Sequence, residues 1–210
     1  MPATTTGSDG EDPGAASADA PAPDAAAAAA DPQVLAAQLR RTNRALQLLV
    51  DCTEAVVRAD SEEALLAEVC RIIVEVGGHR MCWAGIADDD PERTVRPVAI
   101  AGHEDGYLAQ ARITWSDTPH GRGPTGRALR TGQPVVNVDF DTDPTAAPWR
   151  ADAARRGYRS STALPLVYRD QRYGVITSYA AVVRAFDDDE VAILSRLTTT
   201  LALGVHSLRE

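Results

Sequence analysis

The sequence contains no lysine. All 21 of its basic residues are arginine, against 30 acidic residues, and the formal net charge is −9. Six of the acidic residues lie within residues 1–32, which leaves residues 33–210 at −3. Binding to nucleic acid depends largely on a surplus of positive charge, which this chain does not have. The composition therefore predicts no nucleic-acid partner.

Long hydrophobic runs are also missing. No stretch of the sequence approaches the ~20 consecutive apolar residues that a membrane-spanning helix needs. The N-terminal segment lacks the basic and then apolar pattern of a secretory signal. We therefore expect a cytoplasmic protein without a membrane partner.

Cysteine is scarce, and its spacing follows no known metal or redox pattern. Cys52, Cys70 and Cys82 are odd in number, lie far apart in the sequence and form neither a CxxC pair nor a Cys/His set. Cysteine often serves as a small apolar core residue. We expect three reduced, buried thiols and no metal site.

Residues 1–32 differ in composition from the rest of the chain. They consist almost only of Ala, Pro, Asp, Gly, Ser and Thr, and they contain no basic residue. Such a segment buries too little apolar surface to offset the conformational entropy of ordering it. We expect a disordered acidic tail over 1–32 and a single folded domain over 33–210.

Three long segments have the periodicity of helices. A heptad-like stripe predicts a helix over about 34–57, Asp60 and Ser61 precede a second helix that stops at Gly77, and an acidic cap from Asp187 precedes a terminal helix. The stripe of the first helix consists of Leu35, Leu39, Thr42, Leu46, Leu49, Thr53 and Val56. The stripe of the last consists of Val191, Leu194, Thr198, Leu201, Val205 and Leu208.

Short apolar runs between these helices read as strands. Residues 81–87 and 94–101 flank a loop of turn formers and predict a hairpin, and a third strand is expected to end near Trp115. Residues 134–140 are expected to form a further strand. Two more flank the turn signal at 169–171, with short helices expected after Gly123 and near Trp149.

Consecutive hairpins require antiparallel pairing, and the long helices need an apolar face to cover. The economical arrangement is α+β, with one mostly antiparallel sheet and the long helices gathered on one face. Pro165 lacks a backbone N–H and indicates a sheet edge or a bulge.

The stretch "HGRGPTGRALRTGQPVV" contains the pattern G-x-G-x-x-G, which also occurs in dinucleotide-binding folds. That fingerprint needs a buried strand running directly into the first glycine and a long helix carrying the third. Here "SDTPH" separates strand from glycine, the helix is short, and Pro124 removes a backbone donor. The pattern therefore predicts a chain turn rather than a Rossmann nucleotide site.

The motifs "GRGPTGRALRTGQPVVNVDF", "DP" then "APW", "GYRSSTALPLVYRDQRYGVITSYA" and the acidic-capped terminal helix occur in the order typical of GAF domains. Over residues 46–208 the chain closely resembles this family of small-molecule sensory modules of bacterial signalling proteins. The resemblance implies a six-stranded antiparallel sheet with the terminal helices on one face. On the other face it implies a pocket roofed by residues 103–126 and 141–158.

The resemblance also suggests which side chains meet a ligand. Tryptophans fall at or near the roof segments, and a few polar side chains accompany them, which suits a small and partly apolar ligand. The candidate contacts are Trp83, Trp115, Asp117, Asn137, Trp149, Ser161 and Thr177. The same tryptophans also suit a filled core without a ligand, and this alternative stays open.

Departures from specialised GAF domains narrow the function. The stretch "NVDFDTDP" lacks most of the cyclic-nucleotide constellation, and no cysteine lies in a roof segment to attach a bilin. The GAF-fold free methionine-(R)-sulfoxide reductases carry a cysteine where this chain has Thr125, and a hydroxyl cannot replace a thiolate in that chemistry. We therefore expect no enzymatic activity. A lone thiol such as Cys82, if it faced the pocket, would lack a resolving partner.

Other polar residues of the roof have ordinary interpretations beside functional ones. His103 and His120 lie near carboxylates and could ligate a metal, although loop histidines are usually solvated. Arg122 and Arg127 flank the glycine turn and could meet an anionic ligand, although an exposed pair at a helix edge is the simpler interpretation. No cofactor is assigned beyond an unknown small molecule.

The sequence thus predicts a non-catalytic sensory module. A ligand in the pocket favours one arrangement of the roof, and a helix-mediated homodimer transmits the change. The output is expected on a kinase, cyclase or phosphodiesterase, on another chain or beyond the end of this sequence. The alternatives are a dimerisation or scaffold module with a filled core, in which both stripes pack only on the sheet, and a GAF-fold methionine sulfoxide reductase.

Overall fold

An antiparallel sheet of five strands in the order β2-β1-β5-β4-β3 organises the fold, in a computed structural model that describes residues 31–210. The strands are β1 (Met81–Ala87), β2 (Val95–Gly102), β3 (Val135–Asn137), β4 (Ser160–Tyr168) and β5 (Gln171–Ala180). The expected α+β class, with an antiparallel sheet and helices, is confirmed.

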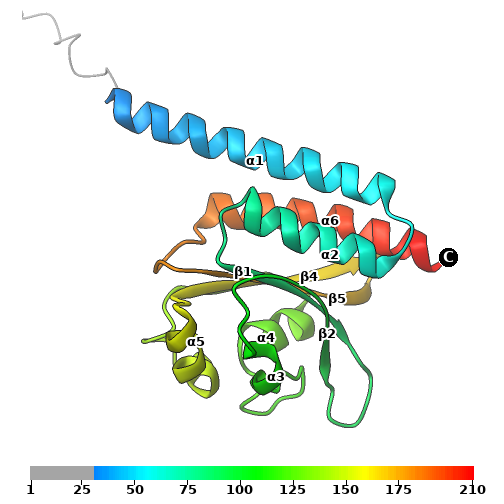
Figure 1. Cartoon of the computed structure of the whole chain (residues 1–210). Helices are drawn as coiled ribbons and strands as arrows, with labels where there is room; N and C mark the ends of the chain where they lie inside the picture. Colours follow the sequence, from blue (N-terminus) through cyan, green and yellow to red (C-terminus); the bar gives the residue numbers. More distant parts are fainter. Residues whose placement is uncertain (1–30) are drawn as a thin grey trace, which may run out of the picture. The chain divides into compact units, whose positions relative to one another are not determined.

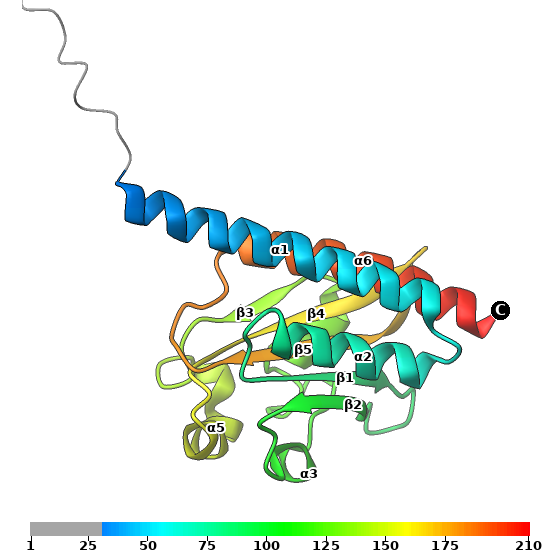
Figure 2. The same ribbon diagram turned by 45° about the horizontal axis from the view of Figure 1, so that its top comes forward.

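Helices cover both faces of the sheet (Figures 1 and 2). On one face, α2 (Glu62–Glu75) packs on β1 and β2, and α6 (Asp188–Arg209) packs on β4 and β5. From Gln38 onward, α1 (Pro32–Arg58) lies outside these two helices, with Leu48 and Cys52 buried in the same core cluster as residues of α2 and α6. The opposite face carries the short helices α3 (Tyr107–Ala111), α4 (Pro124–Thr131) and α5 (Arg150–Arg156) and the 3₁₀ turn η1 (Pro144–Trp149).

Local sequence explains where these helices begin and end. The Ser61 hydroxyl accepts a hydrogen bond from the Ala64 backbone N–H at the start of α2, and the Asp187 carboxylate does the same for Glu190 at the start of α6. Gly132 ends α4 in the left-handed conformation that glycine adopts without a steric penalty. A two-residue turn, Arg169–Asp170, joins β4 to β5 with positive φ at both positions.

The sheet has five strands rather than the six implied by the resemblance. The segment expected to form a third strand pairs with Thr94 only at Thr114, through an isolated bridge. Arg112, just before it, adopts a left-handed conformation with φ 41°, which interrupts extended backbone. Beyond it, Ser116 begins the turn that leads to the glycine stretch.

Pro165 lies on β4 opposite Val175 of β5, beyond the end of β3, which pairs only with residues 161–163. Its missing N–H therefore costs no ladder hydrogen bond on the open side. A register shift between β4 and β5 lies one residue further along β4, between Leu166 and Val167. Both features expected at this proline, a local edge and an irregularity, are present.

Alternation along the strands gives the sheet two separate cores. The helix-side core contains Cys82, Ile176 and Leu201, whereas the roof-side core contains Trp83, Val175 and Tyr179. Among the described helices, α6 is long and apolar enough to span a membrane by length and composition. Part of its apolar surface packs inside the fold, where Leu194, Leu201 and Val205 are fully buried, whereas Leu203 and Leu208 are exposed.

The two heptad-like stripes have different fates. In α6 the stripe from Leu194 to Val205 is buried against the sheet, as one-sided packing requires. In α1 the stripe is divided: Leu39 and Leu46 are exposed, whereas Leu49 and Val56 are partly buried and pack against the core cluster that contains Leu48 and Cys52. Residues 1–30 of the expected acidic tail lie outside the described part of the chain, and Pro32 already belongs to α1.

Candidate functional site

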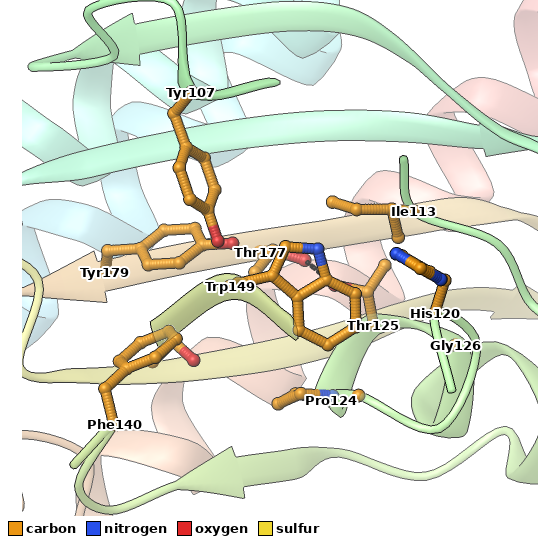
Figure 3. A pocket seen from close by; sticks show the side chains of 12 residues that line it. Tyr107, Ile113, His120, Pro124, Thr125, Gly126, Phe140, Trp149, Thr177 and Tyr179 are labelled. Carbon is orange, nitrogen blue, oxygen red and sulfur yellow. Dashed lines mark hydrogen bonds between the residues drawn. The ribbon is translucent and has the colours of Figure 1, made fainter. Parts of the chain in front are cut away.

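A cavity lies between the sheet and the short helices that cover its roof face (Figure 3). Its volume is about 20 Å³, which is room for roughly one water molecule. Its walls come from α3, the glycine turn and α4, the 3₁₀ turn, and strands β4 and β5. The lining residues are Tyr107, Ile113, His120, Gly123, Pro124, Thr125, Gly126, Phe140, Trp149, Ser161, Thr177 and Tyr179.

Hydroxyl groups form the polar part of this lining. Thr177 of β5 and Thr125 of α4 lie with their hydroxyl oxygens 3.0 Å apart, both residues nearly fully buried. Ser161 reaches the cavity from β4, directly across from Tyr179 in the strand pairing. The Tyr107 hydroxyl points toward that of Tyr179 (Figure 3). Such groups can donate to or accept from a polar ligand without carrying charge at neutral pH.

Aromatic rings form the apolar part of the lining. Tyr179 contacts three rings: Phe140 stacks on it with centroids 6.0 Å apart, Tyr158 lies at 4.7 Å and Tyr107 meets it edge-on at 5.6 Å. Burial raises the pKa of Tyr179 to about 12 and moves the pKa of Tyr107 in the same direction. Both phenols therefore remain neutral across the physiological range.

The indole of Trp149 forms part of the cavity wall from the roof. Its Nε1 donates to the Ala111 carbonyl at 2.5 Å, and the His120 ring meets it edge-on with centroids 6.1 Å apart. A Cβ on Gly123 would lie 2.4 Å from the indole ring, so only glycine lets Trp149 lie this close to the turn.

The other two glycines of the turn are packed against backbone. A Cβ on Gly121 would lie 1.8 Å from the Ser116 carbonyl oxygen, and one on Gly126 would lie 2.2 Å from that of Gly121. Arg130 of α4 holds the same loop, since one of its terminal nitrogens donates to the carbonyls of Trp115, Ser116 and Gly121 at 2.6–3.1 Å. The glycine pattern therefore closes a tight turn at the edge of the cavity.

Buried hydrogen bonds join the two roof segments. The Arg156 guanidinium, whose side chain is 6% exposed, donates to the carbonyls of Glu104 and Asp105. The Tyr158 hydroxyl donates to the His103 carbonyl. These links join the two roof segments into one hydrogen-bonded layer.

Three of the seven candidate contacts lie together in this cavity: Trp149, Ser161 and Thr177. Two others are on the roof face of the sheet but do not line the cavity. Trp83 neighbours Thr177 across β1 and β5, and Asn137 neighbours Ser161 across β3 and β4. The Trp83 Nε1 and Asn137 Nδ2 donors are buried, and neither has an acceptor within the described residues.

The remaining two candidates lie outside the cavity. Trp115 donates from Nε1 to the Asp88 carbonyl at 3.0 Å and stacks under the Arg93 guanidinium, which seals the edge of the roof. Asp117 is exposed and forms an ion pair with Arg122 at 2.8 Å, a contact that lowers the pKa of the Asp117 carboxyl. An exposed pair of this kind contributes little to stability.

The sequence-based list omitted Tyr107, Phe140 and Tyr179, which supply aromatic rings to the cavity wall. A signal for Tyr179 was present, because alternation along β5 places it on the same face as Thr177. No comparable signal marks Tyr107, since a five-residue helix under a loop gives too short a pattern to assign a buried face.

Thiols and metal ligands are distributed away from the cavity. Cys52, Cys70 and Cys82 are free and buried in the helix-side core, so Cys82 faces away from the roof. Burial raises the pKa of the Cys52 thiol to about 12. Within residues 31–210 no group of three or more His, Cys, Asp and Glu side chains is placed to hold a metal ion. His120 lines the cavity without such partners.

Comparison with known proteins identifies the fold that builds this cavity. The family description of the GAF domain matches residues 59–206. The chain belongs to the GAF domain family. Members are generally sensory or regulatory domains that commonly bind small molecules, and the family includes GAF-fold reductases. None of the curated protein sequences matches the chain.

Solved structures agree with this GAF assignment. The chain is similar to the free methionine-R-sulfoxide reductase from Neisseria meningitidis in complex with its substrate, with 23% identity, 86% of this chain and 94% of that chain covered, and a TM-score of 0.66. It is similar to the GAF domain of a phosphoenolpyruvate-protein phosphotransferase from Coxiella burnetii, with 20% identity, 79% and 95% coverage and a TM-score of 0.67. A third is the A. aeolicus nlh2 GAF domain in an inactive state, with 18% identity, 80% and 99% coverage and a TM-score of 0.61. At these identities the likeness concerns the fold alone.

Proposed function

We propose that the chain is a non-catalytic sensory GAF domain of a bacterial signal-transduction pathway, binding a small molecule in the roof cavity and signalling through a helix-mediated homodimer. The observation that carries the proposal is the cavity itself. Hydroxyl groups of Thr125, Thr177, Ser161 and Tyr179 converge between aromatic walls, and apolar lining with a few placed polar groups is typical of small-molecule sites.

The lining favours an uncharged ligand. Among residues 31–210 no Asp, Glu or Arg lines the cavity, and His120 is the one histidine in its lining. A charged ligand would enter without a counter-charge, which burial makes costly. The hydroxyl groups of Thr125, Thr177 and Ser161 in the lining favour a molecule that carries hydrogen-bond acceptors. The ligand class is thus a small, uncharged, partly aromatic molecule with an oxygen or nitrogen acceptor.

A non-catalytic role is supported by the side chain at position 125. Thr125 stands where the resemblance places the cysteine of the GAF-fold reductases, and its hydroxyl lies beside that of Thr177. The three thiols lie on the far side of the sheet from the cavity. Thiol–disulfide chemistry on a bound sulfoxide therefore has no nucleophile in the described lining.

A chain of contacts leads from the cavity to α6. Thr177 faces the cavity, and the next residue of β5, Ser178, faces the helices. The Ser178 hydroxyl lies 2.5 Å from Nδ1 of His79, and Nε2 of His79 lies 3.3 Å from the Glu190 carboxylate in the first turn of α6. A shift of β5 caused by a ligand would reach the start of α6 through His79.

The same end of α6 is held by α1. Arg41 of α1 forms an ion pair with Asp187, the residue that caps α6. The start of α6 therefore receives contacts both from the sheet and from α1. A change at this point alters the relation of the two helices, which is the signal that the proposed dimer reads.

The output is proposed to be a kinase, cyclase or phosphodiesterase, on another chain or in a further part of the same protein, within the cytoplasm. No membrane or nucleic-acid partner is proposed, in keeping with the charge balance of residues 33–210.

A thermal-shift screen with uncharged small molecules tests the proposal. A ligand of the cavity raises the melting temperature of the wild type and does so less in Tyr179→Phe and Thr177→Val, which remove one hydroxyl each at nearly constant volume. A pair of spin labels, one at the exposed Thr199 of each subunit, then reports helix geometry. An unchanged distance on saturation with that compound would contradict signalling through α6.

A second candidate is a dimerisation or scaffold module with a filled core. The small volume of the cavity, about 20 Å³, favours this function, because it leaves room for roughly one water molecule among the lining side chains. In that case no compound shifts the melting temperature and the dimer persists. For the sensory function, by contrast, a compound larger than a water molecule enters the cavity only if Trp149 and the roof segment that carries it move.

A further inference from the structure

Helix α1 carries a line of exposed aliphatic side chains on the face opposite its own packing face. Leu39, Leu46, Val50 and Val57 are 57%, 56%, 51% and 80% exposed. At about 100° per residue these four positions fall within about 40° of one another around the helix axis. The buried Leu48 lies on the opposite side. From residue 39 to residue 57, α1 is therefore apolar on two opposite faces.

Polar residues complete the line at heptad spacing. Asn43 and Thr53, both exposed, lie between the aliphatic positions, so that the steps from residue 39 to residue 57 are four, three, four, three and four. This is the alternation of positions d and a in a coiled coil. A stripe of this kind on a surface helix favours a second helix as its partner.

The line is symmetric about the position of Leu48. If a second copy of α1 runs in the opposite direction with residue 48 at the centre, Leu39 meets the partner's Val57 and Leu46 meets the partner's Val50. Asn43 then meets the partner's Thr53, so that each polar position faces a polar one. Residues 38–58 overlap completely with their copies in this register.

Charge follows the same symmetry. Arg40 and Glu54 flank the line on one side, and both are exposed. In the antiparallel register Arg40 lies beside Glu54 of the partner subunit, and this pair occurs twice. Within residues 31–210 Arg40 makes no ion pair of its own, and Glu54 pairs with Arg58 at 2.9 Å. In a parallel register Arg40 and the partner's Glu54 would be separated by about 21 Å along the helix axis.

We infer that the dimer forms by antiparallel self-pairing of α1 through the line from Leu39 to Val57, with two Arg40–Glu54 ion pairs between subunits. This inference rests on the proposed function, which requires a helix-mediated dimer, and it specifies the partner surface and its direction. The two domains then lie on opposite sides of the α1 pair, since each packs on the face of α1 around Leu48.

Charge exchange tests the direction of pairing. Arg40→Glu or Glu54→Arg alone raises the Kd of the dimer about tenfold at low salt, because each places like charges together twice. The double variant Arg40→Glu with Glu54→Arg returns the Kd to within about threefold of the wild type. Arg127→Glu, on the other face of the sheet, is the matched control and leaves the Kd unchanged. Sedimentation equilibrium on the full chain measures all four.

A distance measurement gives an independent readout. A spin label at Arg40 of each subunit lies about 24 Å from its copy along the axis of an antiparallel pair, whereas parallel helices place the labels side by side. Leu46→Glu, which sets a charge against the partner's Val50, raises the Kd at least about a hundredfold. The inference would be overturned by a wild type that is monomeric or by spin labels that lie side by side. It would also be overturned if the effects of Arg40→Glu and Glu54→Arg on the Kd added up in the double variant instead of cancelling.

Compound binding in the roof cavity distinguishes a failure of the α1 pair from a failure of the proposed ligand binding. Leu46→Glu leaves the roof cavity intact, so a compound that stabilises the wild type also stabilises this monomeric variant. If no compound binds the wild type, the ligand proposal is refuted, and the inference of an antiparallel α1 pair is unaffected. A bound compound with no α1 pair refutes only the direction and surface of dimerisation.

Discussion

Replacing Trp149 by alanine removes the one tryptophan of the roof that lines the cavity. The indole is 6% exposed, and its Nε1 donates to the Ala111 carbonyl at 2.5 Å. Truncating a buried tryptophan costs about 3–5 kcal/mol. The unpaired Ala111 carbonyl adds about 1 kcal/mol, which water entering the opened roof partly offsets. We therefore expect a loss of about 4 kcal/mol in the free energy of unfolding.

For a domain of this size each kcal/mol shifts the melting temperature by about 2–4 °C, so Trp149→Ala lowers it by about 12 °C. Trp149→Phe keeps a ring and loses only the N–H donor and part of the volume, and it is expected to cost about half as much. Differential scanning calorimetry measures both variants against the wild type.

Free indole provides the sharper test, since it matches the side chain that was removed. An apolar cavity created by truncation can bind a small aromatic molecule. At a concentration about ten times its Kd, indole raises the melting temperature of Trp149→Ala by about 4 °C and leaves Trp149→Phe unchanged. A fall of less than about 3 °C in Trp149→Ala, or the absence of any indole effect, would refute the placement of this ring as the cavity wall.

Three further predictions concern the turn, the caps and the thiols. Gly126→Ala forces a Cβ against the Gly121 carbonyl oxygen, so urea unfolding is expected to show a loss of about 3 kcal/mol or more. The Arg41 ion pair lowers the pKa of Asp187 in the folded protein. The stabilisation from this ion pair is therefore complete above the unfolded pKa of 3.8, and it is lost as the pH falls from 3.8 through the lower folded pKa. Asp187→Asn therefore loses less stability between about pH 6 and about pH 3 than the wild type, and an equal loss would contradict this. Burial raises the pKa of Cys52 to about 12. The contribution of the neutral thiol to stability is therefore complete below the unfolded pKa of 9.0 and is lost as the pH rises from 9.0 toward 12. Cys52→Ala removes this dependence, so a plot of the urea midpoint against pH is expected to be flatter at alkaline pH for the variant than for the wild type.

The sequence predicted well those features that local chemistry decides. Ser61 and Asp187 cap their helices because a short polar side chain just before a helix can accept a hydrogen bond from a backbone N–H of the first turn that has no partner within the helix. Gly132 ends α4 as expected, because glycine adopts the left-handed conformation freely. The glycine stretch was correctly separated from a nucleotide fingerprint by its context.

The composition of the cavity depends on tertiary packing and was predicted only in part. Trp83, Trp115 and Trp149 look alike in sequence, yet Trp83 is buried beside Thr177 under the roof and Trp115 seals an edge against Asp88. All three lie on the roof side of the sheet, and which tryptophan reaches the cavity is decided by how the roof segments fold over that face. A single sequence does not encode that choice in any short window.

The outward line on α1 illustrates the same limit from another side. The heptad pattern was visible in the sequence, but the pattern alone could not decide between packing on the sheet and pairing with another helix. Leu49 and Val56 of that stripe pack against the helix-side core, whereas Leu39 and Leu46 are exposed. Only the exposed part of the stripe, which the line from Leu39 to Val57 shares, is available to a partner.

Native mass spectrometry of the purified chain, followed by denaturing extraction, tests most directly whether the roof cavity holds a ligand. The matched control is Ser161→Leu, which fills the cavity from β4 with an apolar side chain. We predict a stoichiometric excess mass from a small uncharged molecule on the wild type and its absence from Ser161→Leu. A bare mass for the wild type, equal to that calculated from the sequence, would contradict the account and favour the filled-core scaffold.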